Sequence, residues 1–520
     1  MGRLATGKFS VFHSKSGRNL RKSVLLERRM EISVCPRILS PKLYTMVLVV
    51  LLPGSCAAAK DYWVSPDIDV TSVVKQISAG DSIILQDGLW HDVELKFERL
   101  PGTGKDSIYI RAETAGQVVF TGQSQLRLSG NHVIVSGLVF RNTNGASDVL
   151  QLRSHSKRHA HKCRVTDCVF EQTSESESGT ESRWLSVYGT KNRVDHCYFG
   201  GKRNRGATLV VWVSEGEGEH RIDQNYFGPR PVLGSNGGET IRIGTSDVSD
   251  FNCRTLVEDN YFHECNGEAE IVSNKSCENT YRHNVFDACS GALTLRHGHR
   301  CLVDSNVFLG RRQRGTGGVR VIGQNHSVTN NYFEGLRGDA ERAAICLMNG
   351  IPDGPLNGYA PVREASVVHN TFIDCKVTME IGVGAGHRQS AAPGDCRITH
   401  NAFLPDKWPL FRIHAEPFNF LWDSNRHQVG RSDSNQHVQF ERVDLRFKRD
   451  SDGLMRPTAT ESICTDVTSA VKKDLDGHPR RDTSLAGCDD PDTPKRSRPS
   501  ALSTGPTWRE SGESGNTSRL

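Results

Sequence analysis

The sequence lacks several features that would place it in common protein classes. Its apolar run at residues 46–52, MVLVVLL, is too short to span a membrane. Between its internal repeats, no segment has the apolar spacing of an amphipathic helix. Its 15 cysteines form no CxxC pair, and no histidine spacing beside them is typical of zinc sites. We therefore expect no membrane span, no helical bundle and no zinc centre.

What the chain does have is an internal repeat of the form V-x-x-N-x-F, with phenylalanines at intervals of roughly 22 to 39 residues. Seven copies contain both residues: Asn225/Phe227, Asn260/Phe262, Asn284/Phe286, Asn306/Phe308, Asn331/Phe333, Asn370/Phe372 and Asn401/Phe403. Three earlier copies end at Phe140, Phe170 and Phe199, with Leu138, Cys168 and Cys197 in the asparagine position.

One such unit consists of short β-branched strands separated by turn residues, so it cannot bury its own apolar face and must stack on its neighbours. The repeat predicts an all-β fold, a right-handed single-stranded parallel β-helix with an N-terminal cap. In it, asparagine forms an inward ladder at a turn and phenylalanine stacks through the core. A β-propeller, whose units are longer and four-stranded, is the alternative.

Residues 1–59 are interpreted as a leader. The apolar run is followed by PGSCAAA, which resembles a signal-peptide cleavage site and predicts a secreted or periplasmic protein, with a lipoprotein anchor at Cys56 as the alternative. The leader holds ten Lys and Arg but two Glu, so residues 60–520 carry about −3, against +5 for the whole chain. No nucleic-acid partner is expected.

Residues 60–488 are predicted to form one β-helical domain, which begins with a short capping helix after Val70. Residues 489–520 are rich in Ser, Thr, Pro and Arg and are predicted to be a disordered tail. Cysteines within the repeats, such as Cys163, are expected to be buried in the core. Cys464 and Cys488 lie outside the repeat and are the pair best suited to a disulfide.

An acidic cluster is predicted on one face of the central coils. Glu268 and Glu270 are two residues apart, so a strand places both on the same side. Asn236 lies in the preceding coil, and adjacent coils are about 4.8 Å apart. Two carboxylates and an amide oxygen form a hard-oxygen site with open coordination positions, which favours Ca²⁺ over zinc.

Basic residues are predicted on the same face. Lys275 follows the two glutamates, Arg296 and His297 end the next apolar alternation, and Arg320 lies in the coil after that. Arg242 points outward in the coil before them, because its neighbours Ile241 and Ile243 point inward. Arginines in this position suit a carboxylate or a sulfate, which they bind bidentately.

These residues stand in longer strings that resemble polysaccharide lyase family 6, which contains alginate lyases and chondroitinase B. The resemblance covers most of residues 60–488 and includes AGDSIILQDGLW, NGGETIRIG, NGEAEIVSNKSCENTYR, LTLRHGHRC, GGVRVIGQNHSVTNNYFEG and ICLMNGIPDGPLNGY. It implies that Asn236, Glu268 and Glu270 hold calcium, that Lys275 is the general base and that Arg296 is the acid. The family pattern has an arginine in the LNGY segment, where this chain has Gly358, which puts a distal substrate contact in doubt.

We assign His297, Arg320 and Arg242 to substrate binding, and His326 less directly. Because a guanidinium keeps its proton up to a pKa above about 12, Arg296 is a poor acid, and proton delivery by a water or a tyrosine stays open. The sequence thus predicts a calcium-dependent lyase, a monomer or homodimer, that cleaves an acidic, uronate-containing polysaccharide by β-elimination. Alginate is the favoured substrate, as for a poly(β-D-mannuronate) lyase, and dermatan sulfate is the alternative. A β-helix glycosidase and a non-catalytic glycan-binding solenoid are the other classes considered.

Overall fold

The computed structural model describes residues 58–143, 145–174, 181–405, 409–428, 441–460, 463–465, 469–480, 485–491 and 493–509. The chain divides into two compact units, residues 1–57 and 58–520. The predicted leader therefore lies almost wholly outside the described residues, and every described strand and helix belongs to the second unit. Within the ranges above, no helix is long and apolar enough to cross a lipid bilayer.

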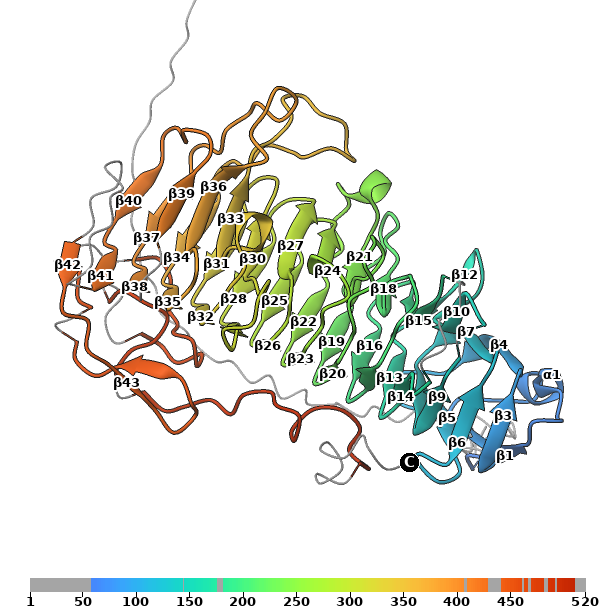
Figure 1. Cartoon of the computed structure of the whole chain (residues 1–520). Helices are drawn as coiled ribbons and strands as arrows, with labels where there is room; N and C mark the ends of the chain where they lie inside the picture. The colour runs from blue at the N-terminus through green and yellow to red at the C-terminus, as the bar shows by residue number, and fades with distance from the viewer. Residues whose placement is uncertain are drawn as a thin grey trace, which may run out of the picture. The chain divides into compact units, whose positions relative to one another are not determined.

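Three 14-stranded sheets, named A, B and C, form the body of this unit (Figure 1). Sheet A contains β1 (Asp61–Val64), β2 (Ser82–Leu85), β5 (Ile108–Ala112), β8 (Val133–Ser136), β13 (Arg164–Thr166), β16 (Arg193–Asp195), β19 (Arg221–Asp223), β22 (Leu256–Glu258), β25 (Thr280–Arg282), β28 (Leu302–Asp304), β31 (Ser327–Thr329), β34 (Ser366–Val368), β37 (Arg397–Thr399) and β40 (Leu421–Asp423).

Sheet B contains β3 (Gly88–His91), β6 (Val118–Thr121), β9 (Leu138–Arg141), β14 (Val169–Glu171), β17 (Tyr198–Gly200), β20 (Tyr226–Phe227), β23 (Tyr261–His263), β26 (Val285–Asp287), β29 (Val307–Leu309), β32 (Tyr332–Glu334), β35 (Thr371–Ile373), β38 (Ala402–Leu404), β41 (Arg426–Gln428) and β42 (Glu441–Val443).

Sheet C contains β4 (Glu94–Pro101), β7 (Gln125–Asn131), β10 (Asp148–Gln151), β11 (Arg153–His155), β12 (Arg158–His161), β15 (Arg183–Val187), β18 (Leu209–Val211), β21 (Ile241–Ile243), β24 (Glu270–Lys275), β27 (Ala292–His297), β30 (Val319–Val321), β33 (Ile345–Met348), β36 (Met379–Val383) and β39 (Phe411–Ile413). Outside the sheets lie the helix α1 (Val70–Val74), the 3₁₀ turns η1 (Ser246–Val248) and η2 (Ala340–Arg342), and the antiparallel pair β43 (Phe447–Arg449) and β44 (Met455–Pro457).

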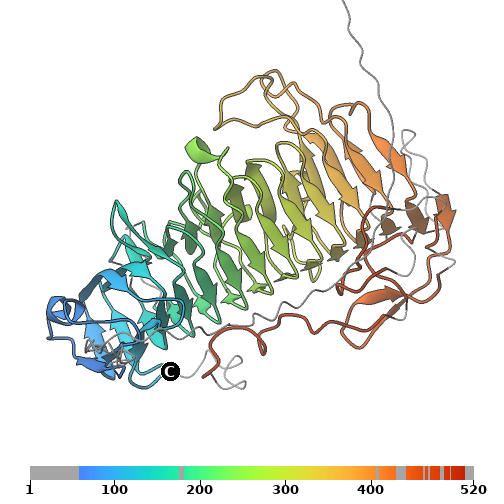
Figure 2. The ribbon, with the colours of Figure 1, turned by 180° about the vertical axis from the view of Figure 1, so that it is seen from behind.

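Each turn of the chain adds one strand to each sheet, as β22, β23 and β24 do before β25, β26 and β27. Figure 2 shows the same succession of coils from behind. This arrangement confirms the predicted right-handed parallel β-helix and excludes the propeller. The predicted cap is present as α1, which begins after Asp69, whose side chain accepts a hydrogen bond from the N–H of Thr71 at 2.9 Å.

The repeated phenylalanines form a continuous stack from Phe120 to Phe403, with ring centroids 4.5 to 5.3 Å apart in successive coils. The repeated asparagines form a second ladder beside it. From Asn260 to Asn425, the Oδ1 atom of each one accepts both the backbone N–H and the side-chain Nδ2 of the asparagine one coil earlier, beginning with Asn225. Both predicted ladders are confirmed.

The cysteines of the repeat lie in the core, as expected. Cys168 and Cys197 occupy the asparagine position in the coils before the ladder begins, and both are fully buried. Cys488 is a buried free thiol, so the suggested disulfide between Cys464 and Cys488 is not formed. Burial raises the pKa of this thiol to about 12.

The prediction of disorder after residue 488 is wrong for the described part of that segment. Residues 485–491 and 493–509, named the C-terminal strap, lie along the β-helix. Asp489 and Asp490 are buried and form ion pairs with Arg456 and Arg480. The composition of the strap suggests solvation, but its charges pair with buried arginines instead of water.

The far end of the strap reaches one of the early coils. The side chain of Trp508 donates to the carbonyl of Asp167 at 2.8 Å, and its ring lies against Gly116. Arg509 pairs with Glu171 at 3.3 Å. The strap therefore contacts coils separated by more than half of the β-helix.

Removing one asparagine from the ladder should destabilise the fold strongly. Asn284→Ala deletes the acceptor of Asn260 and the donor to the carbonyl of Val257, and so leaves buried polar groups unpaired. Each such group costs about 1–3 kcal/mol, so we expect a loss of about 2–5 kcal/mol in urea unfolding. Asn252→Ala, at an exposed position where the side-chain oxygen accepts a hydrogen bond from Arg300, is the control and should cost less than about 0.5 kcal/mol. Equal effects of the two substitutions would contradict a special role for the ladder.

Candidate active site

The predicted face is the outer surface of sheet C at β21, β24, β27 and β30. In the strand register, Arg242 lies opposite Ser273, Ser273 opposite Thr294, and Thr294 opposite Arg320. This row confirms that the arginines of separate coils share one face. An irregularity in the pairing of β24 with β27 follows Glu270, and another precedes Lys275, so neither of these residues follows the simple alternation.

Glu268 lies in the loop before β24 and is held by the preceding coil. Its Oε2 atom accepts the backbone N–H groups of Gly237 and Gly238, at 2.8 and 3.2 Å. Burial, followed by the charge of nearby Glu239, raises the pKa of Glu268 to about 7. Sequence reasoning missed Glu239, which is 4% exposed and has an Oε2 atom without a hydrogen-bond partner. Its place three residues after Asn236, in the same Gly-rich string, was the available signal.

Glu270 begins β24 and faces the basic residues. Its Oε2 atom accepts the hydroxyl of Ser273 at 2.5 Å. Its Oε1 atom lies 3.6 Å from Nη1 of Arg320 and 3.9 Å from Nε of Arg296. Glu270 thus joins the acidic and the basic parts of the face.

The donor set fits a hard cation. Glu239 offers an orphaned buried carboxylate oxygen. The pKa of Glu268 is raised first by burial and then by the charges of Glu239 and Glu270, and a bound cation would offset these effects. Asn236 is exposed on the same loop. The described residues contain no converged group of three or more His, Cys, Asp or Glu, so these carboxylates would have to close around an ion.

The Gly237–Glu239 loop is fixed from below by a buried arginine. Arg230 is 3% exposed and donates to the carbonyls of Gly206, Gly237 and Glu239, at 3.0, 3.3 and 2.5 Å. Burial lowers its pKa to about 10. Arg230 places a positive charge beneath the carboxylates and holds the backbone that binds Glu268.

Lys275 ends β24 and pairs in register with His297 at the end of β27. Its ammonium has no hydrogen-bond or ion-pair partner among the residues that the structure describes. His297 is 4% exposed, and its Nε2 atom lies 3.0 Å from the hydroxyl of Ser246. Burial, with the charges of Arg296 and Lys275, lowers the pKa of His297 to about 3, so this ring is neutral and acts through hydrogen bonds only.

Arg296 and Arg320 enclose an aromatic ring that sequence reasoning missed. The Arg296 guanidinium lies 4.1 Å from the ring centroid of Tyr359, and its Nη1 atom donates to the carbonyl of Gly358 at 3.1 Å. Arg320 is 7% exposed and donates from Nη2 to the hydroxyl of Tyr359 at 3.2 Å. Gly358, noted only as a departure from the family pattern, thus belongs to a loop that contacts the predicted catalytic arginine. Burial lowers the pKa of Arg296.

Arg242 lies on the N-terminal side of the same face. Its guanidinium is 5.3 Å from the ring centroid of Trp212, which stacks on Tyr188 at 5.7 Å. The Nε atom of Arg242 is buried without a hydrogen-bond partner. A cation beside an aromatic ring is suited to an acidic sugar, and the binding role of Arg242 stays a prediction.

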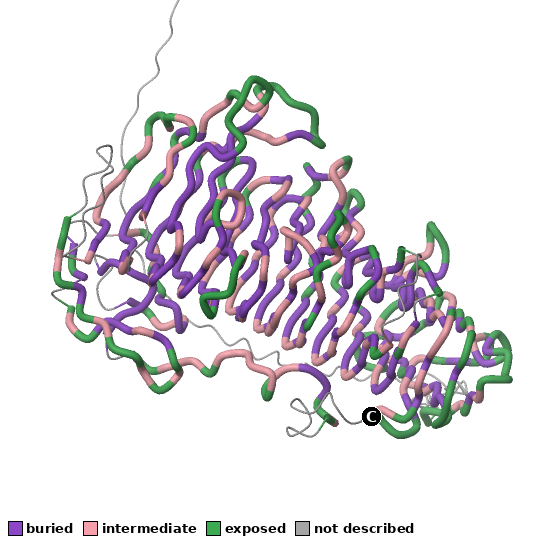
Figure 3. Tube along the Cα trace, viewed as in Figure 1, coloured by how far each residue is buried: buried purple, intermediate pink, exposed green. Residues whose placement is uncertain are grey.

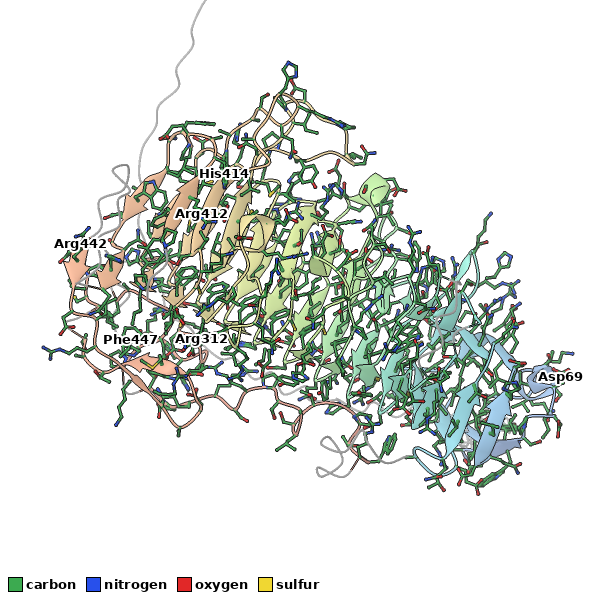
Figure 4. All side chains as sticks on the ribbon, viewed as in Figure 1. Asp69, Arg312, Arg412, His414, Arg442 and Phe447 are labelled. Carbon is green, nitrogen blue, oxygen red and sulfur yellow. The ribbon has the colours of Figure 1, made fainter. Side chains whose placement is uncertain are left out.

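His326, given a weaker binding role, is instead structural. It is fully buried, its Nδ1 atom accepts the N–H of Cys301, and its Nε2 atom bonds the carbonyl of Ile322. At the C-terminal end of sheet C, Arg412 and His414 (Figure 4) contact the buried Glu380, with His414 at 2.6 Å. This second cluster lies two coils beyond Arg320 in the register.

Comparison with known proteins identifies the family of the chain. The sequence model of the family described as chondroitinase B matches residues 64–405. A solved structure of a single-residue variant of the PL6 family alginate lyase AlyGC has 34% identity, covers 86% of this chain and 59% of its own, and has a TM-score of 0.77. Unaltered AlyGC has 38% identity, coverages of 77% and 56%, and a TM-score of 0.73. No curated protein matches the chain.

A mannuronic acid-specific polysaccharide family 6 lyase from human gut microbiota has 31% identity, covers 74% of this chain and 92% of its own, and has a TM-score of 0.65. The chain belongs to the chondroitinase B family, within polysaccharide lyase family 6. It spans somewhat more than half the length of AlyGC.

The raised pKa of Glu268 predicts a specific pH dependence of stability. Since the folded-state pKa of about 7 exceeds the usual 4.5, unfolding releases a proton between these values, and the metal-free protein should lose stability as the pH rises through this window. We expect the melting temperature, measured with chelator present, to fall less steeply with pH in Glu268→Gln. The control Glu219→Gln removes an exposed carboxylate and should leave the parental slope. Parallel profiles for the parent and Glu268→Gln would contradict the assignment.

Proposed function

We propose that the protein is a calcium-dependent polysaccharide lyase that cleaves a uronate-containing polysaccharide by β-elimination, with alginate as the favoured substrate. The observation that carries this proposal is that carboxylates, one unpartnered lysine and two arginines lie together on one face of sheet C. AlyGC and the gut lyase are described as alginate and mannuronic acid-specific lyases, which supports alginate. The chondroitinase B family model supports dermatan sulfate as the second candidate. We also propose that the enzyme is secreted, as the apolar run at residues 46–52 and the following PGSCAAA predict.

The chemistry begins at C5 of the uronate, whose proton is weakly acidic while the neighbouring carboxylate carries its full charge. When bound by Asn236, Glu239, Glu268 and Glu270, calcium would neutralise that charge and stabilise the enolate-like electron distribution. Arg320 contributes a fixed positive charge beside Glu270. These positive charges would lower the barrier to removal of the C5 proton.

Lys275 is the base in this proposal. Its amine must be in the neutral form to take the C5 proton. His297, neutral and fixed by Ser246, can orient the sugar through hydrogen bonds without competing as a base. Arg242, beside Trp212, offers a cation to the carboxylate of a neighbouring sugar residue.

The direct test is the appearance of the unsaturated uronate, followed by its ultraviolet absorbance, on polymannuronate, polyguluronate, mixed alginate and dermatan sulfate. We expect product with alginate. Lys275→Arg keeps the charge but cannot act as a base near neutral pH, so turnover should fall by about 10²- to 10⁴-fold while folding is unchanged. Lys191→Arg, at an exposed position, is the matched control. Absence of product from every polymer would refute the lyase proposal, and near-parental turnover of Lys275→Arg would remove Lys275 from the reaction.

The metal proposal has its own test. EDTA should abolish turnover, and added calcium should restore it. Glu270→Gln should weaken calcium binding, measured by calorimetry without substrate, by about 10-fold or more, since a ligand carboxylate is lost. Glu364→Gln, at an exposed turn, should bind calcium as the parent does. Full activity in the chelated protein would overturn this assignment.

A further inference from the structure

The outer face of sheet C changes in exposure at β30. Several charged residues in the three coils before β30 are partly exposed: Arg242, Glu270, Lys275 and Arg296. The strand register then places Arg320, Cys346 and Glu380 at successive outward positions of β30, β33 and β36. These three residues are 7%, 0% and 1% exposed. The face that carries the proposed reaction is therefore accessible before β30 and covered from β30 onward.

Two segments cover the face beyond this point. The 3₁₀ turn η2 packs against β30, β33 and β36. Although the tip of the β33–β34 loop, residues 352–357, is exposed (Figure 3), the loop returns over β27, where the ring centroid of Tyr359 lies 4.1 Å from the guanidinium of Arg296. Ala340 of η2 and Tyr359 of the loop pack into one apolar cluster with the outward Cys346. We name η2 and this loop together the barrier.

Glu380 attaches η2 to sheet C. Its Oε1 atom accepts the N–H of Ala340 at 2.8 Å. The carboxylate is held in turn from the next coil, where His414 lies 2.6 Å from its Oε2 atom and Arg412 lies 3.4 Å from its Oε1 atom. Because Glu380 is buried, loss of these partners would leave an unpaired charge. The cluster of Glu380, Arg412 and His414 therefore fixes η2 over the covered part of the face.

The two sides of the proposed reaction centre differ in length. Between Lys275 on β24 and the covered strand β33 lie only β27 and β30, a distance of roughly 10 Å and about that of two sugar residues. On the other side, Arg242 and Trp212 are partly exposed. Three coils before Arg242, the partly exposed Arg153 lies 4.0 Å from the ring centroid of Tyr188. This side offers cations to the carboxylates of a long acidic chain.

We propose that the barrier restricts cleavage to the end of a polysaccharide chain, an inference that rests on the proposed lyase function. The chain lies along the row of arginines, with its long part over Arg242 and towards β15. About two sugar residues fit between Lys275 and the barrier, so an internal bond of a long chain does not reach Lys275. Each cycle releases a short fragment and leaves a long polymer. Glu380 is a positioning residue that acts through η2.

The first test compares bonds broken with chain length in the parent protein. The absorbance of the unsaturated uronate counts the bonds broken in alginate, and viscosity reports the length of the remaining chains. We expect absorbance to rise while viscosity falls slowly, with early products of about two sugar residues in mass spectrometry. A series of long oligosaccharides from the first minutes would overturn the proposal. Failure of the lyase function would look different, since no unsaturated product would then form from any polymer.

The second test opens the barrier. Glu380→Gln removes the charge that Arg412 and His414 pair, and so weakens the attachment of η2. We expect the loss of viscosity per bond broken to increase several-fold and longer oligosaccharides to appear among the first products. A change in stability alone would lower the total activity without changing this ratio. The ratio therefore reports on the position of the cut and not on folding.

A second variant and a control complete this test. Asp339→Asn removes the carboxylate that Lys376 binds at 2.5 Å, directly before η2, and should raise the same ratio if Glu380→Gln does not fold. Glu258→Gln is the matched control, because this buried carboxylate also contacts two cations, Arg221 at 2.9 Å and Arg282 at 2.7 Å, but lies on sheet A. It should keep the parental ratio. An unchanged ratio in the folded Glu380 and Asp339 variants would overturn the role of η2.

Discussion

The stacking of one coil on the next is the constraint on which the rest of the structure depends. The phenylalanine stack and the asparagine ladder each pair one residue per coil with its counterpart in the next, so neither tolerates a shift in register. Because the inside of each coil is fixed in this way, the outer residues of sheet C also fall into rows. Arg242, Ser273, Thr294 and Arg320 form one of these rows although about 80 residues separate the first from the last.

On this scaffold, the negative and the positive side chains of the site lie mainly in different coils. Carboxylates gather at the Gly237–Glu239 loop and at the start of β24, and arginines gather two coils later, with Glu270 between them. Each group is only partly neutralised within the protein, as shown by the unpartnered atoms of Glu239 and Arg320. A ligand that supplies both a cation and a carboxylate satisfies both ends of the face. The proposed calcium ion together with a uronate would meet that requirement.

The sequence was sufficient to predict those features that repeat. The Asn and Phe positions predicted the β-helix and its two ladders, and alternation placed Arg242 and Arg320 on one face. Features that depend on irregular segments were missed. Tyr359 contacts Arg296 because its loop folds back over that arginine. The position of such a loop leaves no periodic pattern in the sequence. Glu239 reads as one polar residue among many until its burial is known. The strap was taken for a disordered tail because its composition does not show that Asp490 meets the buried Arg480.

The C-terminal strap changes how the coils depend on each other. In a simple solenoid each coil is coupled only to its neighbours, so one end can fray while the other stays folded. The strap bonds the carbonyl of His400 through Gly487, pairs with Asp259 through Arg496, and contacts Asp167 through Trp508. If some coils along this span unfold while others stay folded, the strap must therefore also detach from the unfolded coils. The strap acts as a longitudinal tie that raises the cost of such boundaries and makes the stacked coils melt more nearly as one unit.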